Sequence, residues 1–285
     1  MRFVGRAFSA MRMLLILAGL CCRAAMTWGA GAPPVLRVGL FPNLSPVALV
    51  RLYAPLGNYL SAQLQVPVQL YTATNFRAFM QALHAGRYEL AVAPPHLAWF
   101  AVAHCGYVPL ARYTAKIRGV LVVRKGSVLN SIAALRGKRI AFPDPLALMT
   151  QAIEAAMAKD GLVAGRDYRI VMAQSHNNAA MMVVRGEAAA AGIGGIPLRS
   201  LPSEVASQLR VIYTTPALST QYLLVKASEP LALRNRIRMG LLDFANTPAG
   251  TAFLKRGGLG GIEPASAAGL AAYRKYLPAT SGTAP

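Results

Sequence analysis

From residue 35 onward, short runs of aliphatic residues alternate with longer stretches in which apolar residues recur at every third or fourth position. The run at 35–42 predicts a buried strand, and the spacing of apolar residues predicts a helix over 45–64. A strand at 66–73, a helix over 75–86 that ends at Gly86, and a strand at 88–95 continue the pattern. Strands and helices in alternation are typical of a parallel sheet with helices on both faces.

The alternation starts again near residue 119 and gives a second set of elements of similar size. Strands are predicted at 119–127, 138–144, 168–173 and 187–195, and helices at 131–137, 145–162 and 177–186. Two comparable units predict an α/β protein with two lobes, each a mostly parallel sheet flanked by helices. A β-rich stretch at 209–228 and helices over 231–245 and 247–255 complete one of the lobes.

The first 32 residues have the order of segments found in a secretory signal peptide. Arg2, Arg6 and Arg12 precede an apolar run at 13–20, and small residues extend to Ala32. That run is too short to span a bilayer, and no later stretch reaches the roughly 18 apolar residues that a spanning helix needs. We therefore expect cleavage near residue 30 or 32 and a periplasmic mature chain.

Lipid anchoring through Cys21 or Cys22 is the alternative to simple cleavage. It is disfavoured because a lipoprotein signal has a small residue before its cysteine, where this chain has Leu20 and Cys21. Without the signal segment, Cys105 is the one remaining cysteine, so no internal disulfide can form.

The chain is strongly basic, with 30 Lys and Arg residues against 10 Asp and Glu. Removing the four arginines of the signal segment leaves 26 against 10, a net charge of +16. Such a charge favours small anionic ligands through long-range attraction. A solvated basic surface explains it equally well, because the basic residues are scattered. Without a basic block or interleaved aromatic residues, and with export expected, we predict no nucleic-acid partner.

Four consecutive polar residues stand out between a predicted strand and a predicted helix: Ser175, His176, Asn177 and Asn178. The carboxyl edge of an open α/β sheet binds ligands, and helix N-termini favour anions through unpaired N–H groups. A hydroxyl, an imidazole and amide groups can hold an oxyanion there. The alternative is ordinary N-capping by Ser175 or Asn177 with a solvated His176.

The same edge is predicted to carry further polar residues from other strand ends. Asn43 follows the first strand, Asn75 the second and His96 the third, and Thr150 ends the turn at 144–150 in the second unit. Polar turns that converge from two lobes predict a ligand-binding cleft.

Several blocks of the chain resemble the phosphate, phosphite and phosphonate binding proteins of bacterial ABC importers. The blocks are "YAPLGNYLSAQL", "MQALHAGRYELAVAPPHLAWFA", "LRGKRIAFPDP" and "SHNNAAMMVVRGEA", and the resemblance covers nearly all of residues 35–276. It implies a type 2 periplasmic-binding-protein fold with two hinge strands. It also implies a monomer that closes on its ligand and delivers it to permease subunits in the inner membrane.

The resemblance also implies boundaries. Lobe 1 would comprise residues 33–117 and 218–285, and lobe 2 residues 118–217, after a signal peptide at 1–32. The hinge would lie near 118–122 and 213–222.

Carried over residue by residue, Ser175 and His176 match the family's Ser-His pair, whose histidine contacts the oxyanion. Asp144 and Pro145 match its Asp-Pro turn, but the consecutive hydroxyl residues that usually follow are here Leu146 to Met149, and only Thr150 keeps a hydroxyl. Members that bind aminoalkylphosphonates use an acidic residue where this chain has Gly194 and Gly195. The resemblance therefore disfavours an amine-bearing ligand, and either a more apolar ligand or weaker binding follows from the lost hydroxyls.

Other chemistry finds little support in the sequence. The histidines His84, His96, His104 and His176 have no neighbouring ligand at metal-binding spacing, so we predict neither a metal nor a cofactor. We expect Cys105 to be buried. The sequence shows no nucleophile paired with a base, so it does not indicate an enzyme. A periplasmic sensor that presents its closed form to a membrane partner is the alternative to transport, and a catalytic relative of the fold is a third, less favoured alternative.

Overall fold

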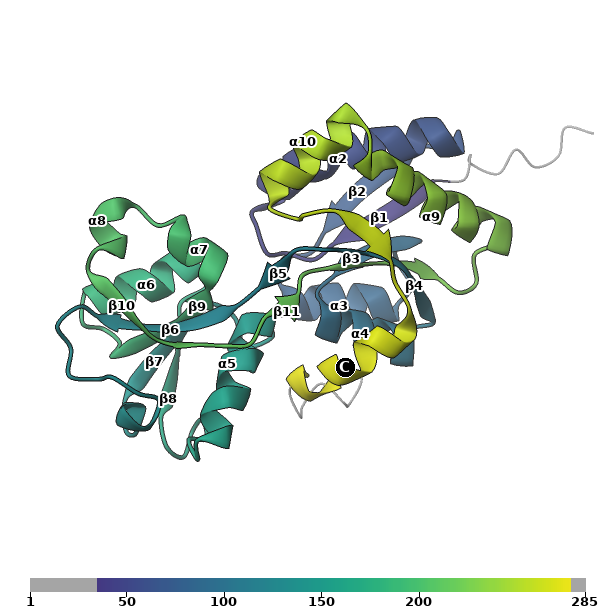
Figure 1. Cartoon of the computed structure of the whole chain (residues 1–285). Helices are drawn as coiled ribbons and strands as arrows, with labels where there is room; N and C mark the ends of the chain where they lie inside the picture. Colours follow the sequence, from purple (N-terminus) through teal and green to yellow (C-terminus); the bar gives the residue numbers. More distant parts are fainter. Residues whose placement is uncertain (1–34, 278–285) are drawn as a thin grey trace, which may run out of the picture. The chain divides into compact units, whose positions relative to one another are not determined.

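The computed structural model describes residues 35–277, so the predicted signal segment at 1–32 lies outside the described residues. Within this range the chain forms two large sheets with helices on both faces of each (Figure 1). The predicted α/β fold is confirmed. No helix in this range combines the length and apolar composition that crossing a membrane would require.

The larger sheet has six strands. Their order is β13 (Ile262–Pro264), β4 (Tyr107–Tyr113), β12 (Tyr222–Lys226), β3 (Leu90–Ala93), β1 (Leu36–Leu40) and β2 (Val68–Thr72). β1 pairs in parallel with both β2 and β3, whereas β12 and β13 pair antiparallel with their neighbours. The carboxyl ends of β1, β2 and β3 therefore meet at one edge.

Helices cover both faces of this sheet. One face carries α2 (Pro46–Leu64), α9 (Leu231–Ala245) and α10 (Pro248–Gly257), and the other carries α3 (Phe76–His84), α4 (Pro95–His104) and the 3-10 helix η2 (Ala267–Tyr276). Alternate residues of β3 serve the two faces: Leu90 and Val92 pack in the first core, and Ala91 and Ala93 in the second. This explains why the strand is apolar at every position.

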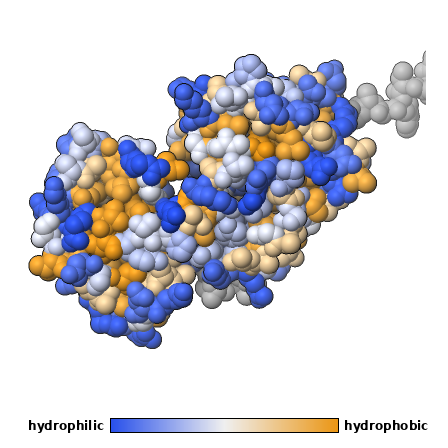
Figure 2. All heavy atoms as spheres, in the orientation of Figure 1, coloured by the Kyte–Doolittle hydropathy of each residue, from blue (hydrophilic) through white to orange (hydrophobic). Residues whose placement is uncertain are grey.

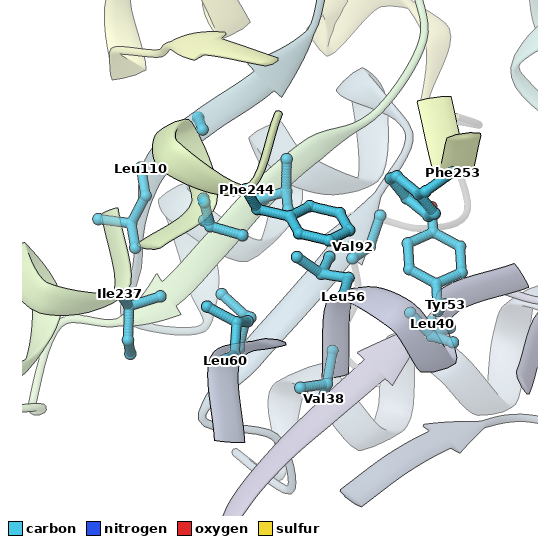
Figure 3. Close-up of a cluster of buried hydrophobic side chains, with 14 of the residues drawn as sticks. Val38, Leu40, Tyr53, Leu56, Leu60, Val92, Leu110, Ile237, Phe244 and Phe253 are labelled. Atoms are coloured by element: carbon cyan, nitrogen blue, oxygen red, sulfur yellow. The ribbon is translucent and has the colours of Figure 1, made fainter. Parts of the chain in front are cut away.

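Aromatic rings fill the core under α2 and α10 (Figure 3). The ring of Phe253 lies with its centroid 5.4 Å from that of Tyr53 and 5.5 Å from that of Phe244. All three side chains are almost completely buried. Truncation of such a phenylalanine to alanine typically costs about 3–5 kcal/mol, so this cluster is a main source of stability for the six-stranded unit.

The smaller sheet has five strands. Their order is β10 (Leu209–Thr214), β6 (Gly119–Arg124), β9 (Ala190–Gly194), β7 (Arg139–Phe142) and β8 (Arg169–Met172). β7 pairs in parallel with β8 and β9, and β6 pairs antiparallel with β9 and β10. One face packs against α5 (Leu148–Lys159) and η1 (Ala133–Leu135), and the other against α6 (His176–Val184), α7 (Gly195–Arg199) and α8 (Ser203–Ala206).

The small residues of β9 have a packing reason. A Cβ atom on Gly192 would lie only 2.1 Å from Cε1 of Phe142 on the neighbouring strand. Glycine is the one residue that lets the Phe142 ring lie against the backbone of β9. The apolar, small-residue stretch that follows the polar turn at Ser175 is therefore a buried central strand.

Two short strands, β5 (Lys116–Ile117) and β11 (Leu218–Ser219), pair antiparallel outside both large sheets. They lie on the two chain segments that connect strands of the six-stranded sheet to strands of the five-stranded sheet (Figure 1). Residues 119–122, part of the segment that the sequence suggested for the hinge, lie in β6 of the five-stranded sheet.

Candidate functional site

The carboxyl edge of the five-stranded sheet collects three helix starts. The parallel strands β7, β8 and β9 end at Phe142, Met172 and Gly194, and α5, α6 and α7 begin shortly after them. The predicted site residues Thr150, Ser175, His176 and Asn177 all lie in the first turns of these helices or just before them. The structure thus brings the four residues to one edge, as the order of strands and helices predicted.

Ser175 is the N-cap of α6. Its Oγ accepts a hydrogen bond from the backbone N–H of Asn178 at 3.1 Å, and its backbone is extended. Gln174 before it has a φ of 63°, a left-handed conformation that few non-glycine residues adopt. Ser175, and not Asn177, is therefore the capping residue, and the exposed Asn177 side chain stays free for other partners.

His176 is partly buried, and its ring has a defined tautomer. The backbone N–H of Gly194 lies 3.3 Å from Nδ1. Because a backbone N–H can only donate, Nδ1 accepts, and the ring proton of the neutral histidine is on Nε2. Burial lowers the pKa of His176 to about 4, so the ring is neutral at neutral pH. His176 therefore offers a neutral N–H donor rather than a solvated cation.

The start of α5 is rich in unpaired donors. Its N-cap, Ala147, has no side-chain oxygen to accept from the first N–H groups of the helix. Thr150 in this first turn is fully buried, and its Oγ1 has no hydrogen-bond partner among residues 35–277. Asp144 fixes the preceding turn by accepting from the N–H of Leu146 at 2.7 Å. Burial raises the pKa of Asp144.

His96 lies in the first turn of α4, on the six-stranded sheet. The sequence placed it at a ligand-binding edge, and the structure shows a fully buried side chain. Its Nε2 is 2.8 Å from the carbonyl oxygen of Leu146, so Nε2 carries the proton and Nδ1 is an unpaired acceptor within the described part of the chain. Burial lowers the pKa of His96 to about 4. This hydrogen bond links α4 to the turn that precedes α5.

Asn43 and Asn75 lie at the carboxyl edge of the six-stranded sheet. Asn75 is the N-cap of α3, where its Oδ1 accepts from the N–H of Ala78 at 2.9 Å. Asn43 lies in the bend after β1, and both side chains are exposed. The predicted residues thus fall into two groups, one on each sheet, and the hydrogen bond from His96 to Leu146 joins them.

Two cationic residues beside the site were not among the predicted ones. Gly195 donates its backbone N–H to the carbonyl oxygen of Arg118 at 2.8 Å, and a Cβ on Gly195 would lie 3.8 Å from Nη1 of Arg199. Both arginines are exposed; Arg118 directly precedes β6, and Arg199 is the last residue of α7. The position of Arg118 beside a predicted strand was the available signal, but the pairing of Gly119 with Gly194 that gathers the two arginines was not visible in the sequence.

Gly194 and Gly195 differ in the space around them. A Cβ on Gly194 would lie 3.0 Å from Cδ of Pro197 and 3.7 Å from Cε1 of His176. At this position the chain therefore has neither a carboxylate nor the room for one. Among residues 35–277, no group of three or more His, Cys, Asp and Glu side chains lies close enough to hold a metal ion. Cys105 is half-buried, and burial raises the pKa of its thiol to about 11, which makes it a poor nucleophile.

One concave surface of the five-stranded unit lies away from this site. A groove of about 650 Å³ at the amino edge of the sheet is lined by the basic residues Arg124, Lys125, Lys138 and Arg139. It contains none of the predicted site residues. Figure 2 shows hydrophilic side chains scattered over the visible face, with apolar patches between them, in agreement with the scattered basic residues of the sequence.

Two helix-covered sheets, connected through β5 and β11 and each presenting helix starts at its carboxyl edge, define the class of type 2 periplasmic binding proteins. The family of periplasmic substrate-binding proteins of phosphonate ABC transporters matches residues 38–270. The chain belongs to this family. Its members bind and deliver a substrate to an ABC transporter and are not enzymes, and the family is periplasmic.

Solved structures show the same fold. The binding protein component of an ABC phosphonate transporter from Pseudomonas aeruginosa superposes with a TM-score of 0.74 at 18% identity, over 86% of this chain and 85% of that one. PhnD1 from Prochlorococcus marinus, in complex with methylphosphonate, gives a TM-score of 0.75 at 16% identity, over 85% and 96%. A histidine kinase sensor domain similar to periplasmic binding proteins gives 0.56 at 14% identity, over 82% and 99%.

Proposed function

We propose that this protein captures a small phosphorus oxyanion between its two lobes and presents it to the permease of an ABC importer by hinge closure. The observation that carries the proposal is the state of His176. Its Nδ1 is occupied by the N–H of Gly194, so its Nε2–H is a fixed donor at the carboxyl edge of the sheet. A neutral, pre-oriented donor suits an anion that must be bound and then released.

The neighbouring groups support an oxyanion. The uncapped first turn of α5 and the unpaired Oγ1 of Thr150 add donors, and a helix N-terminus favours negative charge. Nδ1 of His96 is an unpaired acceptor, the kind of group to which a protonated phosphonate oxygen can donate.

The residues around the donors favour a ligand without an amine. Gly194 and Gly195 provide no carboxylate, and Leu146 to Met149 provide no hydroxyl after the Asp-Pro turn. The solved structure of PhnD1 contains methylphosphonate, whose methyl group needs neither a carboxylate nor a hydroxyl partner. We therefore propose an alkylphosphonate or a similarly compact oxyanion as the ligand, in preference to aminoethylphosphonate.

Closure about β5 and β11 is the proposed motion. With the hinge at these strands, lobe 1 comprises residues 33–117 and 218–285 and lobe 2 residues 118–217; the strand membership of the two sheets supports this division. A ligand that contacts both lobes shifts the equilibrium by its preference for the closed form. We propose that the mature protein acts as a monomer after removal of a signal peptide at 1–32.

A sensor role is the second candidate, favoured by the occurrence of the fold in a histidine kinase sensor domain. Import requires that reconstituted permease and ATPase subunits take up the ligand only with this protein present. Sensing requires no uptake but a ligand-dependent response of a membrane kinase.

The ligand class is tested by thermal melting of the chain from Gly31 with phosphate, phosphite, methylphosphonate, aminoethylphosphonate and sulfate. A ligand at a hundred times its Kd adds about 2.7 kcal/mol of stability. We expect methylphosphonate to raise Tm more than aminoethylphosphonate does. A shift with aminoethylphosphonate alone, or with none of the phosphorus compounds, contradicts the proposal.

A further inference from the structure

Cationic side chains converge on one buried hydroxyl at the hinge strands. Ser219 on β11 is 2% exposed, and Lys116 is directly opposite on β5. Oγ of Ser219 lies 3.2 Å from Nζ of Lys116 and 3.1 Å from Nη1 of Arg112 on β4. The backbone N–H of Ser219 donates to the hydroxyl of Tyr273 on η2 at 3.0 Å.

The hydrogen bonds of this cluster leave donors without acceptors. Ammonium and guanidinium groups can only donate, so both lone pairs of Ser219 Oγ accept and its own O–H must point to another acceptor. Tyr273 likewise accepts from Ser219 and keeps its O–H for donation. No described residue accepts from either hydroxyl. The lack of an acceptor destabilises the buried Ser219 hydroxyl most, because Tyr273 is only partly buried.

The charge of the cluster is also unbalanced. Nη2 of Arg112 is 2.6 Å from Oε1 of Glu263, which neutralises one of the two cations. Lys116 forms no ion pair within residues 35–277, and the neighbouring Arg118 donates only to the carbonyl oxygen of Thr215. Arg112, Glu263 and Lys116 together therefore keep one positive charge, on the exposed Lys116 beside two hydroxyl donors, and Arg118 adds a second cation without an ion pair among the described residues.

We infer that Lys116, Ser219 and Tyr273 hold a small monovalent anion, such as chloride, at the hinge. The ammonium group supplies the charge, and the two O–H groups supply hydrogen bonds of the charge-assisted kind. Lys116 is the one charged group among these three side chains, which suits a monoanion better than a dianion. None of the three side chains forms a hydrogen bond to His176, Thr150 or His96 in the described part of the chain, so this is a second site that does not depend on the proposed oxyanion ligand.

An ion at this position would connect three elements of the fold. It would join β5, β11 and η2, and η2 also packs against α4, where Arg274 lies over the Trp99 ring with its Cζ 5.6 Å from the centroid. An ion there stabilises the folded protein and the hinge arrangement in proportion to its concentration over its Kd.

The test compares sodium chloride with sodium gluconate at equal ionic strength, because gluconate is a six-carbon carboxylate and is much larger than chloride. We expect Tm to rise with chloride and to saturate. A single lost contact to a charged partner corresponds to a roughly tenfold weaker chloride Kd, so Lys116→Gln and Tyr273→Phe should each show at least that loss. Lys125→Gln removes the same charge at the amino edge of the five-stranded sheet and should retain the wild-type chloride response.

Bromide gives the direct readout, since its anomalous signal in a crystal should lie within contact distance of Nζ of Lys116, Oγ of Ser219 and the hydroxyl of Tyr273. Equal Tm values in chloride and gluconate would overturn the inference and leave water as the acceptor. An equal loss of the chloride response in Lys125→Gln would also overturn it, because it would indicate general screening of surface charge. Methylphosphonate binding, measured in gluconate, should survive Lys116→Gln; its loss together with an absent chloride response would place Lys116 in the oxyanion site instead.

Discussion

Nε2 of His96 lies 2.8 Å from the carbonyl oxygen of Leu146, which joins the first turn of α4 to the turn before α5. The two residues are 50 positions apart in the sequence: His96 lies in a helix on the six-stranded sheet, and Leu146 in the turn before a helix on the five-stranded sheet. Leu146 and Ala147 also pack against the core that contains α4. The lost hydroxyl positions of this turn are thus occupied by residues that make an apolar contact with the first lobe.

Substitutions at His96 should distinguish the contribution of this hydrogen bond to stability from the contribution of the buried side-chain volume. His96→Ala removes the donor and leaves a buried cavity, and we expect a loss of roughly 2–4 kcal/mol in the free energy of unfolding. His96→Gln can place an N–H near the same carbonyl and should recover a part of that loss. Urea denaturation measures both, and an alanine variant within about 0.5 kcal/mol of wild type would show that the contact is not a stabilising one.

Stability should fall on mild acidification. Burial lowers the pKa of His96 and of His176 to about 4 in the folded protein, whereas both titrate near 6.5 in the unfolded chain. Between these values the unfolded chain binds more protons. The stabilising contribution is therefore complete above pH 6.5 and is lost as the pH falls toward 4. For the fully buried His96 the shift corresponds to about 3 kcal/mol.

The measurement is Tm as a function of pH for wild type and His96→Gln. Burial raises the pKa of Asp144, which acts with the opposite sign, but this carboxyl is present in both proteins and its contribution cancels in the difference. The variant should lose less stability than wild type between pH 6.5 and 4. Parallel curves would contradict a buried, neutral His96.

The two adjacent glycines at the end of β9 should respond differently to alanine. In Gly194→Ala the new methyl group would lie 3.0 Å from Cδ of Pro197, against His176, so we expect lower stability by about 1–2 kcal/mol and weaker ligand binding. In Gly195→Ala the nearest atom, the carbonyl oxygen of Arg118, is at 3.4 Å, an ordinary contact. The matched pair is compared by urea denaturation, and equal effects of both substitutions would argue against the crowding of Gly194 by Pro197.

Capping of α6 can be assigned by a second matched pair. Ser175→Ala removes the acceptor for the N–H of Asn178 and should cost about 1 kcal/mol, whereas Asn177→Ala should stay within about 0.5 kcal/mol because its side chain is exposed. If Asn177→Ala cost more stability in urea denaturation than Ser175→Ala, the assignment of Ser175 as the N-cap of α6 would be wrong.

Much of the fold follows from local patterns, and the exceptions have a physical reason. The helices α2, α3, α6 and α9 begin and end close to their predicted bounds, because each has one apolar face and a capping or helix-ending residue. Helix α4 was not predicted, since apolar residues occupy nearly all sides of "PHLAWFAVAH" and show no period. The 3-10 helix η2 was not predicted, because no local sequence signal as strong as those of the predicted helices marks it.

The candidate site was predictable as a set of helix starts but not in its chemistry. The order of strands and helices indicated that Ser175 and Thr150 share an edge. The sequence could not show that Gly194 fixes the tautomer of His176, because that contact spans 18 positions and depends on the pairing of β9 with β7. Nor could it show the burial of His96, which depends on Leu146 in the other lobe.

The central claim is that His176 donates to the bound oxyanion, and calorimetric titration with methylphosphonate tests it most directly. The wild-type chain from Gly31 is compared with His176→Ala and with His84→Ala, in which an exposed histidine far from the site is changed. We expect one bound ligand per chain, an unchanged Kd for His84→Ala, and a Kd at least about tenfold higher for His176→Ala, since a hydrogen bond to a charged ligand contributes about 1.5–3 kcal/mol. Equal affinities of wild type and His176→Ala would contradict the account.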